Sequence, residues 1–293
     1  MTDNLSPKPE RQHPLYNMRP PTPRPAPDPN APQRPRRHVK LARPTATYIL
    51  IAVNVLVFVV RALSVDLNWS LLDWGANSPQ LVLQAGEYYR LFTSMFLHAS
   101  IYAPSGGWAL ANSAHLAFNM YILYVVGRGL EPVFRAPRFT AIYLLGGLTG
   151  SLLSALLGDW QSYSVGASGA VFAVLGAEFI FLYQHKEMMG AAGAAQRRSL
   201  INLGVINLIF GLLANSAGSA MRIDNWAHIG GLAGGVILAW FLGPKVTLRP
   251  DPLDPNTLVV DDANPFSGRL GVIFAYTAGL VILLLLGMGR TGG

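Results

Sequence analysis

Long apolar segments separated by short polar ones recur along most of the chain. Their approximate ranges are 46–63, 108–127, 138–157, 166–183, 200–216, 226–243 and 270–288. Each is close to the roughly 17 to 25 residues that a helix needs to cross a hydrocarbon layer about 30 Å thick. Several are rich in glycine, which weakens a helix in water but lets helices in a membrane approach closely. The pattern predicts seven membrane-spanning helices.

The composition agrees with a membrane protein. Hydrophobic residues make up 51% and charged residues 13% of the 293 residues, and this charged fraction is about half that of an average soluble domain. So few charges argue against a soluble globular protein, and so many apolar residues exclude a disordered chain. The chain has no cysteine, which excludes a disulfide framework, a thiol nucleophile and any thiolate metal site.

The N-terminal segment, residues 1–44, differs from the rest. It holds nine of the 22 Lys and Arg residues, many prolines and almost no apolar periodicity. Such a segment cannot bury a core, so we expect a disordered cytoplasmic tail. It has no apolar region followed by a small-residue cleavage site, which argues against a signal peptide. A nucleic-acid-binding arm is the competing interpretation, but interleaved aromatic residues are lacking and a hydrophobic span follows directly. We therefore expect no nucleic-acid partner.

The basic residues predict the orientation of the spans. With the N-terminus in the cytoplasm, 18 Lys and Arg residues fall in or beside cytoplasmic segments and three fall outside, while Arg61 lies at the outer end of the first span. Cytoplasmic loops of membrane proteins carry an excess of Lys and Arg. We therefore expect a cytoplasmic N-terminus and a location in the cell (inner) membrane.

Four polar residues stand out within the apolar spans. They are His115 and Asn119 in the second span, Ser168 in the fourth and His228 in the sixth. Polar groups are costly in a membrane, so each is a candidate for a functional site, although hydrogen bonds between helices are a common alternative explanation. The three spans all run from outside to inside, and the four residues lie within about the first dozen positions of each. We expect them at one depth, near the outer face.

Small residues flank Ser168 and His228. Ser168 lies in Gly166-Ala-Ser-Gly169, and the stripe Gly166, Ala170, Ala173 and Ala177 gives its helix a flat face. Gly231 and Gly235 follow His228 on the sixth span. Two flat faces can pack closely, which would bring Ser168 within hydrogen-bond reach of His228, as a serine nucleophile and a histidine base require. No Asp lies within a span, so we expect a dyad and not a triad.

These residues resemble the rhomboid family of intramembrane serine proteases. The resemblance is carried by Gly166-Ala-Ser168-Gly169, by Ala227-His228-Ile-Gly-Gly231-Leu-Ala-Gly-Gly235, by His115-Leu-Ala-Phe-Asn119 and by the outer-loop stretch Tyr89-Arg90-Leu-Phe-Thr-Ser-Met-Phe-Leu-His98. It implies an all-α membrane protein, a polytopic helical bundle with a six-span core and a seventh C-terminal span. The domains expected are the tail (1–44), the catalytic core (45–243), a cytoplasmic linker (244–269) and an extra transmembrane helix with a short outer tail (270–293).

The resemblance also implies a role for each residue. Ser168 would be the nucleophile and His228 its general base, while His115, Asn119 and the Ser168 backbone N–H would form the oxyanion hole. Phe172 matches the aromatic residue that packs on the catalytic imidazole. The supporting glycines are Gly166, Gly169, Gly231 and Gly235. Neutral donors in a low-dielectric site stabilise the oxyanion of peptide hydrolysis, and one such donor is worth about 3 kcal/mol.

Two features depart from the family pattern. Tyr88-Tyr89-Arg90 stands where the family usually has Trp-Arg, and the connection between His98 and His115 is longer than usual. Both lie in the outer loop, so they affect substrate access more than chemistry. Glu178 lies ten residues after Ser168, about 80° off its helix face. We expect Glu178 to bond within the bundle, without a catalytic role.

The predicted function is a serine endopeptidase that cleaves membrane-spanning protein substrates near their outer end within the lipid bilayer. We expect no cofactor and no metal. Other classes of membrane protease are excluded, because no His begins an H-E-x-x-H zinc site and no span holds the Asp pair of an aspartyl protease. Two alternatives stay open: a catalytically silent rhomboid-like binding protein, and a transporter that uses the polar residues as a pathway. The oligomeric state does not follow from the sequence.

Overall fold

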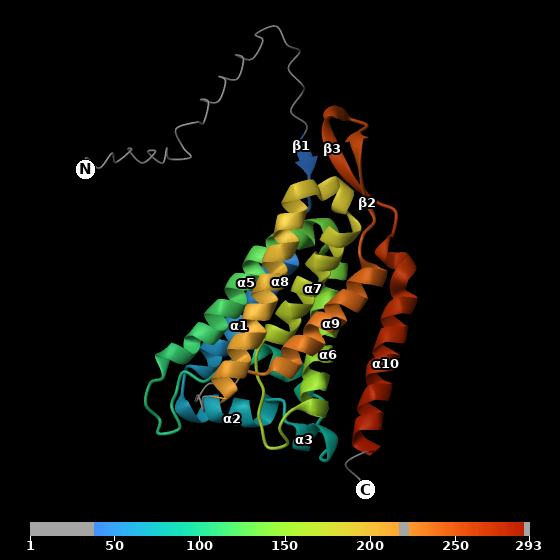
Figure 1. The fold of residues 1–293 in the computed structure, drawn as a ribbon. Helices are drawn as coiled ribbons and strands as arrows, with labels where there is room; N and C mark the ends of the chain where they lie inside the picture. The colour runs from blue at the N-terminus through green and yellow to red at the C-terminus, as the bar shows by residue number, and fades with distance from the viewer. Residues whose placement is uncertain (1–37, 217–222, 290–293) are drawn as a thin grey trace, which may run out of the picture. The chain divides into compact units, whose positions relative to one another are not determined.

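The computed structural model describes residues 38–216 and 223–289. The tail predicted over 1–44 falls mainly outside these residues, as do Arg222 and Arg290. The described residues form a bundle of long helices with a small sheet at one end and short helices at the other (Figure 1). We call these the sheet end and the α2 end.

The long helices include all seven predicted spans, with shifted bounds. They are α1 (Thr45–Arg61), α5 (Ser113–Phe134), α6 (Ala136–Leu157), α7 (Ser168–Gln184), α8 (Lys186–Ser216), α9 (Asn225–Leu242) and α10 (Leu270–Gly289). In Figure 1, α5, α7 and α9 begin at the α2 end and run toward the sheet, while α6, α8 and α10 run the opposite way. The short helices are α2 (Val65–Gly75), α3 (Pro79–Leu83), α4 (Arg90–Thr93), and the 3-10 turns η2 (Ser94–Phe96), η3 (Leu110–Asn112) and η4 (Phe266–Arg269).

Four helical segments of the described chain are long and apolar enough to cross a membrane. They are α6, α8, α9 and the continuous stretch Phe266–Gly289 that includes α10. Two further apolar helices, α1 and α7, are shorter, with 17 residues each. The count of seven spans stays a prediction.

The second and fifth predicted spans begin elsewhere than expected. α5 starts at Ser113 and not at 108, because a turn and η3 precede it. α8 starts at Lys186, so most of the predicted loop 184–199 is helical; a kink at Gly190 follows its first turn. Good helix formers such as Ala, Gln and Arg fill this segment. After the kink, residues 191–216 of α8 form a helix about 39 Å long, which exceeds the hydrocarbon thickness.

The prediction of an all-α fold is wrong in one respect, because the described residues include a three-stranded sheet. β2 (Val246–Asp251) and β3 (Asp254–Asp262) form an antiparallel hairpin, and β1 (His38–Lys40) pairs parallel to β3. The predicted linker 244–269 therefore has structure of its own. Its β-branched residues, including three valines and two threonines, favour strands, a signal that its many charges and prolines obscured.

The helices α6, α7 and α9 touch through backbone atoms. A Cβ added at Gly231 of α9 would lie 1.9 Å from the Gly169 carbonyl oxygen of α7, and one at Gly235 would lie 2.0 Å from the Ala173 oxygen. A Cβ at Gly150 of α6 would lie 2.6 Å from a backbone oxygen of α9. No side chain larger than hydrogen fits at these positions. The predicted close packing of the fourth and sixth spans is confirmed, with Gly169 and Ala173 as the partners on α7.

A buried carboxylate joins α5 to α1. The side chain of Glu131 is fully buried and accepts hydrogen bonds from the backbone N–H groups of Ala46 and Thr47 at 2.8 and 2.7 Å. It also accepts the Thr47 hydroxyl at 2.7 Å. Helix N-termini leave backbone donors unsatisfied and favour negative charge. Glu131 thus supplies from α5 the cap that α1 lacks in its own sequence.

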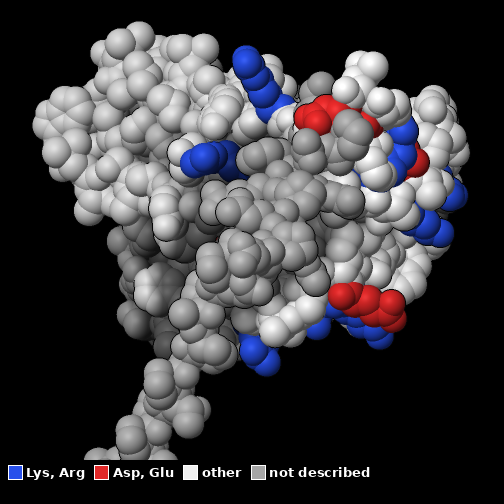
Figure 2. All heavy atoms as spheres, turned by 90° about the horizontal axis from the view of Figure 1, so that it is seen from above, with Lys and Arg blue, Asp and Glu red and all other residues white. Residues whose placement is uncertain are grey.

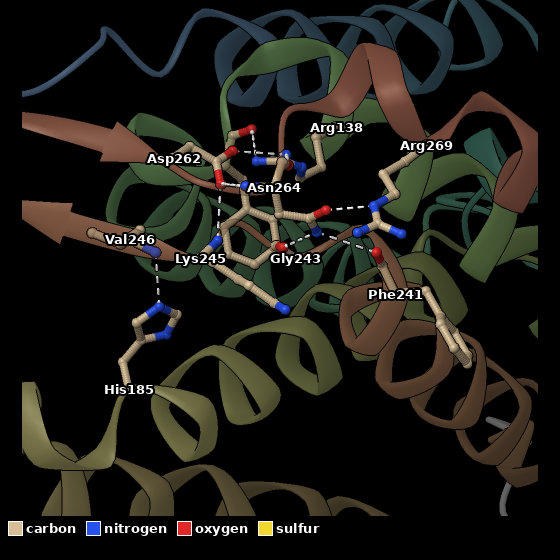
Figure 3. Close-up of polar contacts among 10 residues, drawn as sticks. Arg138, His185, Phe241, Gly243, Lys245, Val246, Asp262, Asn264 and Arg269 are labelled. Carbon is tan, nitrogen blue, oxygen red and sulfur yellow. Dashed lines mark hydrogen bonds and ion pairs between the residues drawn. The ribbon is translucent and has the colours of Figure 1, made fainter.

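A polar cluster fastens the sheet and the start of α10 to the bundle (Figure 3). Arg138 at the start of α6 is 2% exposed and donates to the Asp262 carboxylate at 2.9 Å and to the Asn264 carbonyl at 2.6 Å. The Asn264 amide donates to the Gly243 carbonyl at 2.8 Å and accepts from Arg269. These contacts join α6, the end of α9, β3 and the segment that enters α10.

The hairpin also contacts α7 at its end. The Val246 backbone N–H donates to the His185 ring at 3.0 Å.

Burial alone would raise the pKa of the Asp262 carboxyl, but hydrogen bonds from the Asn264 backbone and from Arg138 lower it below its usual value. Asp262 therefore stays ionised opposite Arg138 at neutral pH.

Exposed basic side chains gather at the sheet end. Figure 2 views the molecule from this end and shows Lys and Arg at several places around it, with fewer acidic residues. Five exposed basic residues there are Arg128, Arg135, Lys186, Lys245 and Arg249. At the α2 end the described basic residues Arg61 and Arg90 are buried, at 1% and 5% exposure. The two ends of the bundle therefore differ in exposed positive charge.

Gly231→Ala is expected to destabilise the bundle, because its methyl group would meet the Gly169 carbonyl and force α7 and α9 apart. Overpacking of this kind costs about 1–3 kcal/mol. The midpoint of thermal unfolding in detergent micelles should fall by several degrees. Gly129→Ala is the control, since nothing lies within 4 Å of its added Cβ. Equal midpoints for the two variants would contradict the contact.

Glu131→Ala is expected to leave the first N–H groups of α1 without partners, at a cost of about 2 kcal/mol. Glu131→Gln keeps one oxygen acceptor and loses the charge, so its stability should lie between those of the wild type and the alanine variant. Glu187→Ala, at an exposed acidic residue in the first turn of α8, should leave the unfolding midpoint unchanged. If Glu131→Ala and Glu187→Ala have the same unfolding midpoint, the Glu131 cap contributes nothing to stability.

Candidate active site

Ser168 is the first residue of α7 and lies at the α2 end of the bundle, partly exposed. Gly166, two residues earlier, has a φ of 134°, a conformation that side chains rarely adopt. The Gly166 N–H donates to the Ser94 carbonyl at 2.9 Å. This anchored turn explains why the helix begins at Ser168 and not at the predicted 166. It also leaves the Ser168 N–H in the first helical turn, where donors lack an intrahelical partner.

His115 faces the same small space as Ser168. A Cβ added at Gly166 would lie 2.8 Å from His115 Cε1, 3.0 Å from His115 Nε2 and 3.7 Å from Ser168 Oγ. The imidazole edge and the hydroxyl therefore border the space over Gly166 from two sides. The absence of a side chain at Gly166 keeps this space open.

His228 of α9 is stacked on an aromatic ring of α7. It is 6% exposed, and its ring lies 4.3 Å from that of Phe172 at an interplanar angle of 5°. Phe172 is one turn after Ser168 on α7. The backbone contact between Gly169 and Gly231 holds the first turns of α7 and α9 together. His228 is thereby fixed over the first turn of the helix that Ser168 begins.

Asn119 lies one turn beyond His115 on α5 and is 4% exposed. Its amide donates to the His115 carbonyl at 2.8 Å, so one of its two N–H groups is occupied within its own helix. Of the predicted site residues, Ser168 and His115 border the space over Gly166, and His228 stacks on Phe172. Among the described residues no hydrogen bond joins Ser168 to His228, and Asn119 bonds to His115.

Glu178 lies elsewhere, as predicted. It is 8% exposed and accepts a hydrogen bond from the Gln196 amide of α8. The expectation that it bonds within the bundle is confirmed. In the ranges 38–216 and 223–289, no group of three or more His, Cys, Asp and Glu side chains is arranged to hold a metal ion.

One acidic residue near His228 was missed in the sequence. Asp224 caps α9: its Oδ1 accepts the Ala227 N–H at 2.9 Å, and its Oδ2 accepts the Ser154 hydroxyl of α6. Asp224 directly precedes the sixth span, and the His228 Nδ1 has no hydrogen-bond partner in the described part of the chain. The dyad therefore stays a prediction. An Asp directly before an apolar helix is a typical N-cap, and this signal could have found Asp224.

Comparison with known protein sequences identifies the family of this chain. A family model of the rhomboid domain matches residues 85–245. The rhomboid protease GluP of Bacillus subtilis is 36% identical over 207 residues, which cover 69% of this chain and 36% of GluP. RHOMBOID-like protein 1 of Arabidopsis thaliana is 32% identical over 222 residues, which cover 72% and 52%.

The rhomboid protease AarA of Providencia stuartii is 32% identical over 218 residues, which cover 66% of this chain and 70% of AarA. The chain thus spans between about a third and about two thirds of the length of these three relatives. The domain match covers more than half of the chain and includes Ser168, His228, His115 and Asn119. The chain is an integral membrane protein and belongs to the rhomboid family.

Proposed function

We propose that this chain is a serine endopeptidase that hydrolyses peptide bonds in or near the ends of transmembrane helices of other membrane proteins. Two of its relatives are named rhomboid proteases. The observation that carries the proposal is the shared space at the start of α7, bordered by the Ser168 hydroxyl and the His115 ring. The His228 ring lies over the same helical turn, stacked on Phe172.

In the proposed reaction, Ser168 Oγ attacks the carbonyl carbon of the scissile peptide bond and its proton passes to the His228 ring. The carbonyl oxygen becomes an oxyanion. When the tetrahedral intermediate collapses, the C–N bond breaks and the imidazolium gives its proton to the departing amine. Water then attacks the acyl-serine ester, with His228 again taking and returning a proton. The products are an amine and a carboxylic acid, and the enzyme is regenerated.

We assign the oxyanion hole to the Ser168 N–H, the His115 ring and the Asn119 amide. The Ser168 N–H lies at a helix N-terminus, where unsatisfied donors and the helix dipole favour negative charge. His115 Nε2 borders the space beside Ser168 Oγ. Asn119 can offer the N–H that does not bond to His115. All three donors are neutral, so they stabilise the oxyanion without a buried charge in the resting enzyme.

We further propose that the α2 end faces outward and the sheet end faces the cytoplasm. The exposed basic residues at the sheet end support this orientation. The predicted cytoplasmic segments also hold 18 basic residues, whereas the predicted outer segments hold three. The N-terminus would then be cytoplasmic in the cell (inner) membrane, with six spans in the core and α10 as a seventh. Cleavage would occur near the outer end of the substrate helix.

The substrate must expose a carbonyl that an intact helix keeps in hydrogen bonds. In a membrane every backbone group needs a partner, so helix-weakening residues near the cut favour cleavage. A small side chain at the cut suits the narrow space over Gly166, where His115 and Ser168 lie on either side. We therefore propose transmembrane segments with Gly, Ala or Ser near their outer end as substrates.

A serine-directed fluorophosphonate is expected to label the wild type and not Ser168→Ala, because only an activated serine attacks phosphorus. In liposomes, cleavage of a single-span substrate should be lost in both Ser168→Ala and His228→Ala. Ser199→Ala, at an exposed serine of α8, is the control and should keep wild-type labelling and cleavage. Activity that survives either dyad substitution would disprove the assignment.

Gly166→Ala is expected to reduce kcat by at least about a hundredfold, the effect of losing one oxyanion donor. The new methyl group would stand within 3.0 Å of the His115 ring and push it from Ser168. Gly106→Ala is the matched control, because Gly106 also has a positive φ, 85°, but no atom lies within 4 Å of its added Cβ. Cleavage rates should be measured for both. Equal losses would mean that backbone strain, and not the site, is responsible.

A further inference from the structure

The carboxylate of Asp224 is held at the start of α9 by two partners. Oδ1 accepts the Ala227 backbone N–H at 2.9 Å. Oδ2 accepts the hydroxyl of Ser154, a residue of α6 that is 4% exposed. One oxygen is thus fixed by α9 itself and the other by the neighbouring helix. The carboxylate therefore has a single orientation as the cap of α9.

His228 follows Asp224 by four residues at the start of α9. The His228 backbone N–H donates to the Asp224 carbonyl at 3.2 Å, so the two residues are one helical turn apart. A negative charge one helical turn away favours the protonated form of an imidazole. Phe172 of α7, which stacks on the ring, is uncharged. Asp224 is therefore the acidic residue in the helical turn before His228.

The His228 ring has little other support for a positive charge. Its Nδ1 is buried and, in the described part of the chain, has no hydrogen-bond partner. One face of the ring is covered by Phe172. A buried imidazolium without a nearby negative charge is costly. The proposed reaction nevertheless forms this imidazolium each time His228 takes the Ser168 proton.

We propose that Asp224 is a positioning residue for the His228 base. The fixed negative charge of Asp224 stabilises the imidazolium that forms on His228 during attack by Ser168. The inference rests on the proposed function. Asp224 does not touch the substrate and receives no proton; it acts through His228. Because the imidazolium exists only after proton transfer, the charge stabilises the transition state more than the bound substrate. Its loss should therefore lower kcat and leave KM unchanged.

The alternative is that Asp224 only caps α9, and Asp224→Asn separates the two roles. Asn is as good an N-cap as Asp, so the variant keeps the bond from Ala227 and loses the charge. We expect an unfolding midpoint close to the wild type and a kcat lower by roughly ten- to a hundredfold, as for the loss of one charge a few Å from a developing cation. Asp224→Ala removes cap and charge, so both stability and kcat should fall.

Asp66→Asn is the matched control, since Asp66 is an exposed acid in the first turn of α2 at the same end of the bundle. It should leave kcat, KM and the unfolding midpoint unchanged. If Asp224→Asn does not fold, Asp224→Ser offers an uncharged cap for the same comparison. A stable, uncharged variant with wild-type kcat would overturn the proposal and reduce Asp224 to a cap.

Fluorophosphonate labelling distinguishes this failure from failure of the proposed function. If the wild type labels at Ser168 and cleaves substrate while Asp224→Asn is equally active, only the role of Asp224 is wrong. If the wild type neither labels nor cleaves, the proposed function fails and the inference fails with it. The expected result is a labelled wild type and an Asp224→Asn variant that labels at Ser168 roughly ten- to a hundredfold more slowly.

Discussion

The contact between the backbones of α7 and α9 sets the geometry on which the candidate site depends. Gly231 and Gly235 of α9 lie against the carbonyl oxygens of Gly169 and Ala173, too close for any Cβ on the glycines. In lipid the hydrophobic effect does not drive helices together, so close van der Waals contact must do so. A spacing fixed by backbone atoms leaves no flexible side chain to absorb a shift. Ser168 and His228 lie next to these contacts, so their backbone positions are fixed as well.

Polar groups are placed where lipid would leave the backbone unsatisfied. Glu131 caps α1 from another helix, and Asp224 caps α9 from its own N-terminus. At the sheet end, Arg138 donates to the Asn264 carbonyl and the Asn264 amide donates to the Gly243 carbonyl. These carbonyls lie in the segment that leaves α9 and enters α10. Glu131, Arg138 and Asn264 are buried and Asp224 is half-buried, and all four are hydrogen-bonded, as such groups must be at low dielectric. The bundle is therefore held by glycine contacts in its middle and by specific polar contacts at its ends.

The sequence predicted the parts of this structure that depend on local pattern. Apolar length located the long helices, and small residues near Ser168 and His228 indicated which two pack together. The start of α7 was misplaced by two residues, because the anchored turn at Gly166 depends on Ser94, far away in the chain. The sheet was missed because β1 and β3 are about 220 residues apart, a pairing that no local pattern encodes. Asp224 was overlooked because it lies just before the sixth span, although its place ahead of an apolar helix is a typical N-cap signal.

The helix N-termini at the α2 end suggest why a neutral site can stabilise an anion. α9 begins with the carboxylate of Asp224, which accepts the Ala227 N–H. α7 begins without a capping side chain: Ala167 stands at its N-cap, so its first N–H groups are left for another acceptor. The two helices touch, and their dipoles point the same way. Capping α9 with a negative charge favours a cation on His228, and leaving α7 uncapped favours an anion beside Ser168, which is the charge pair that acylation creates.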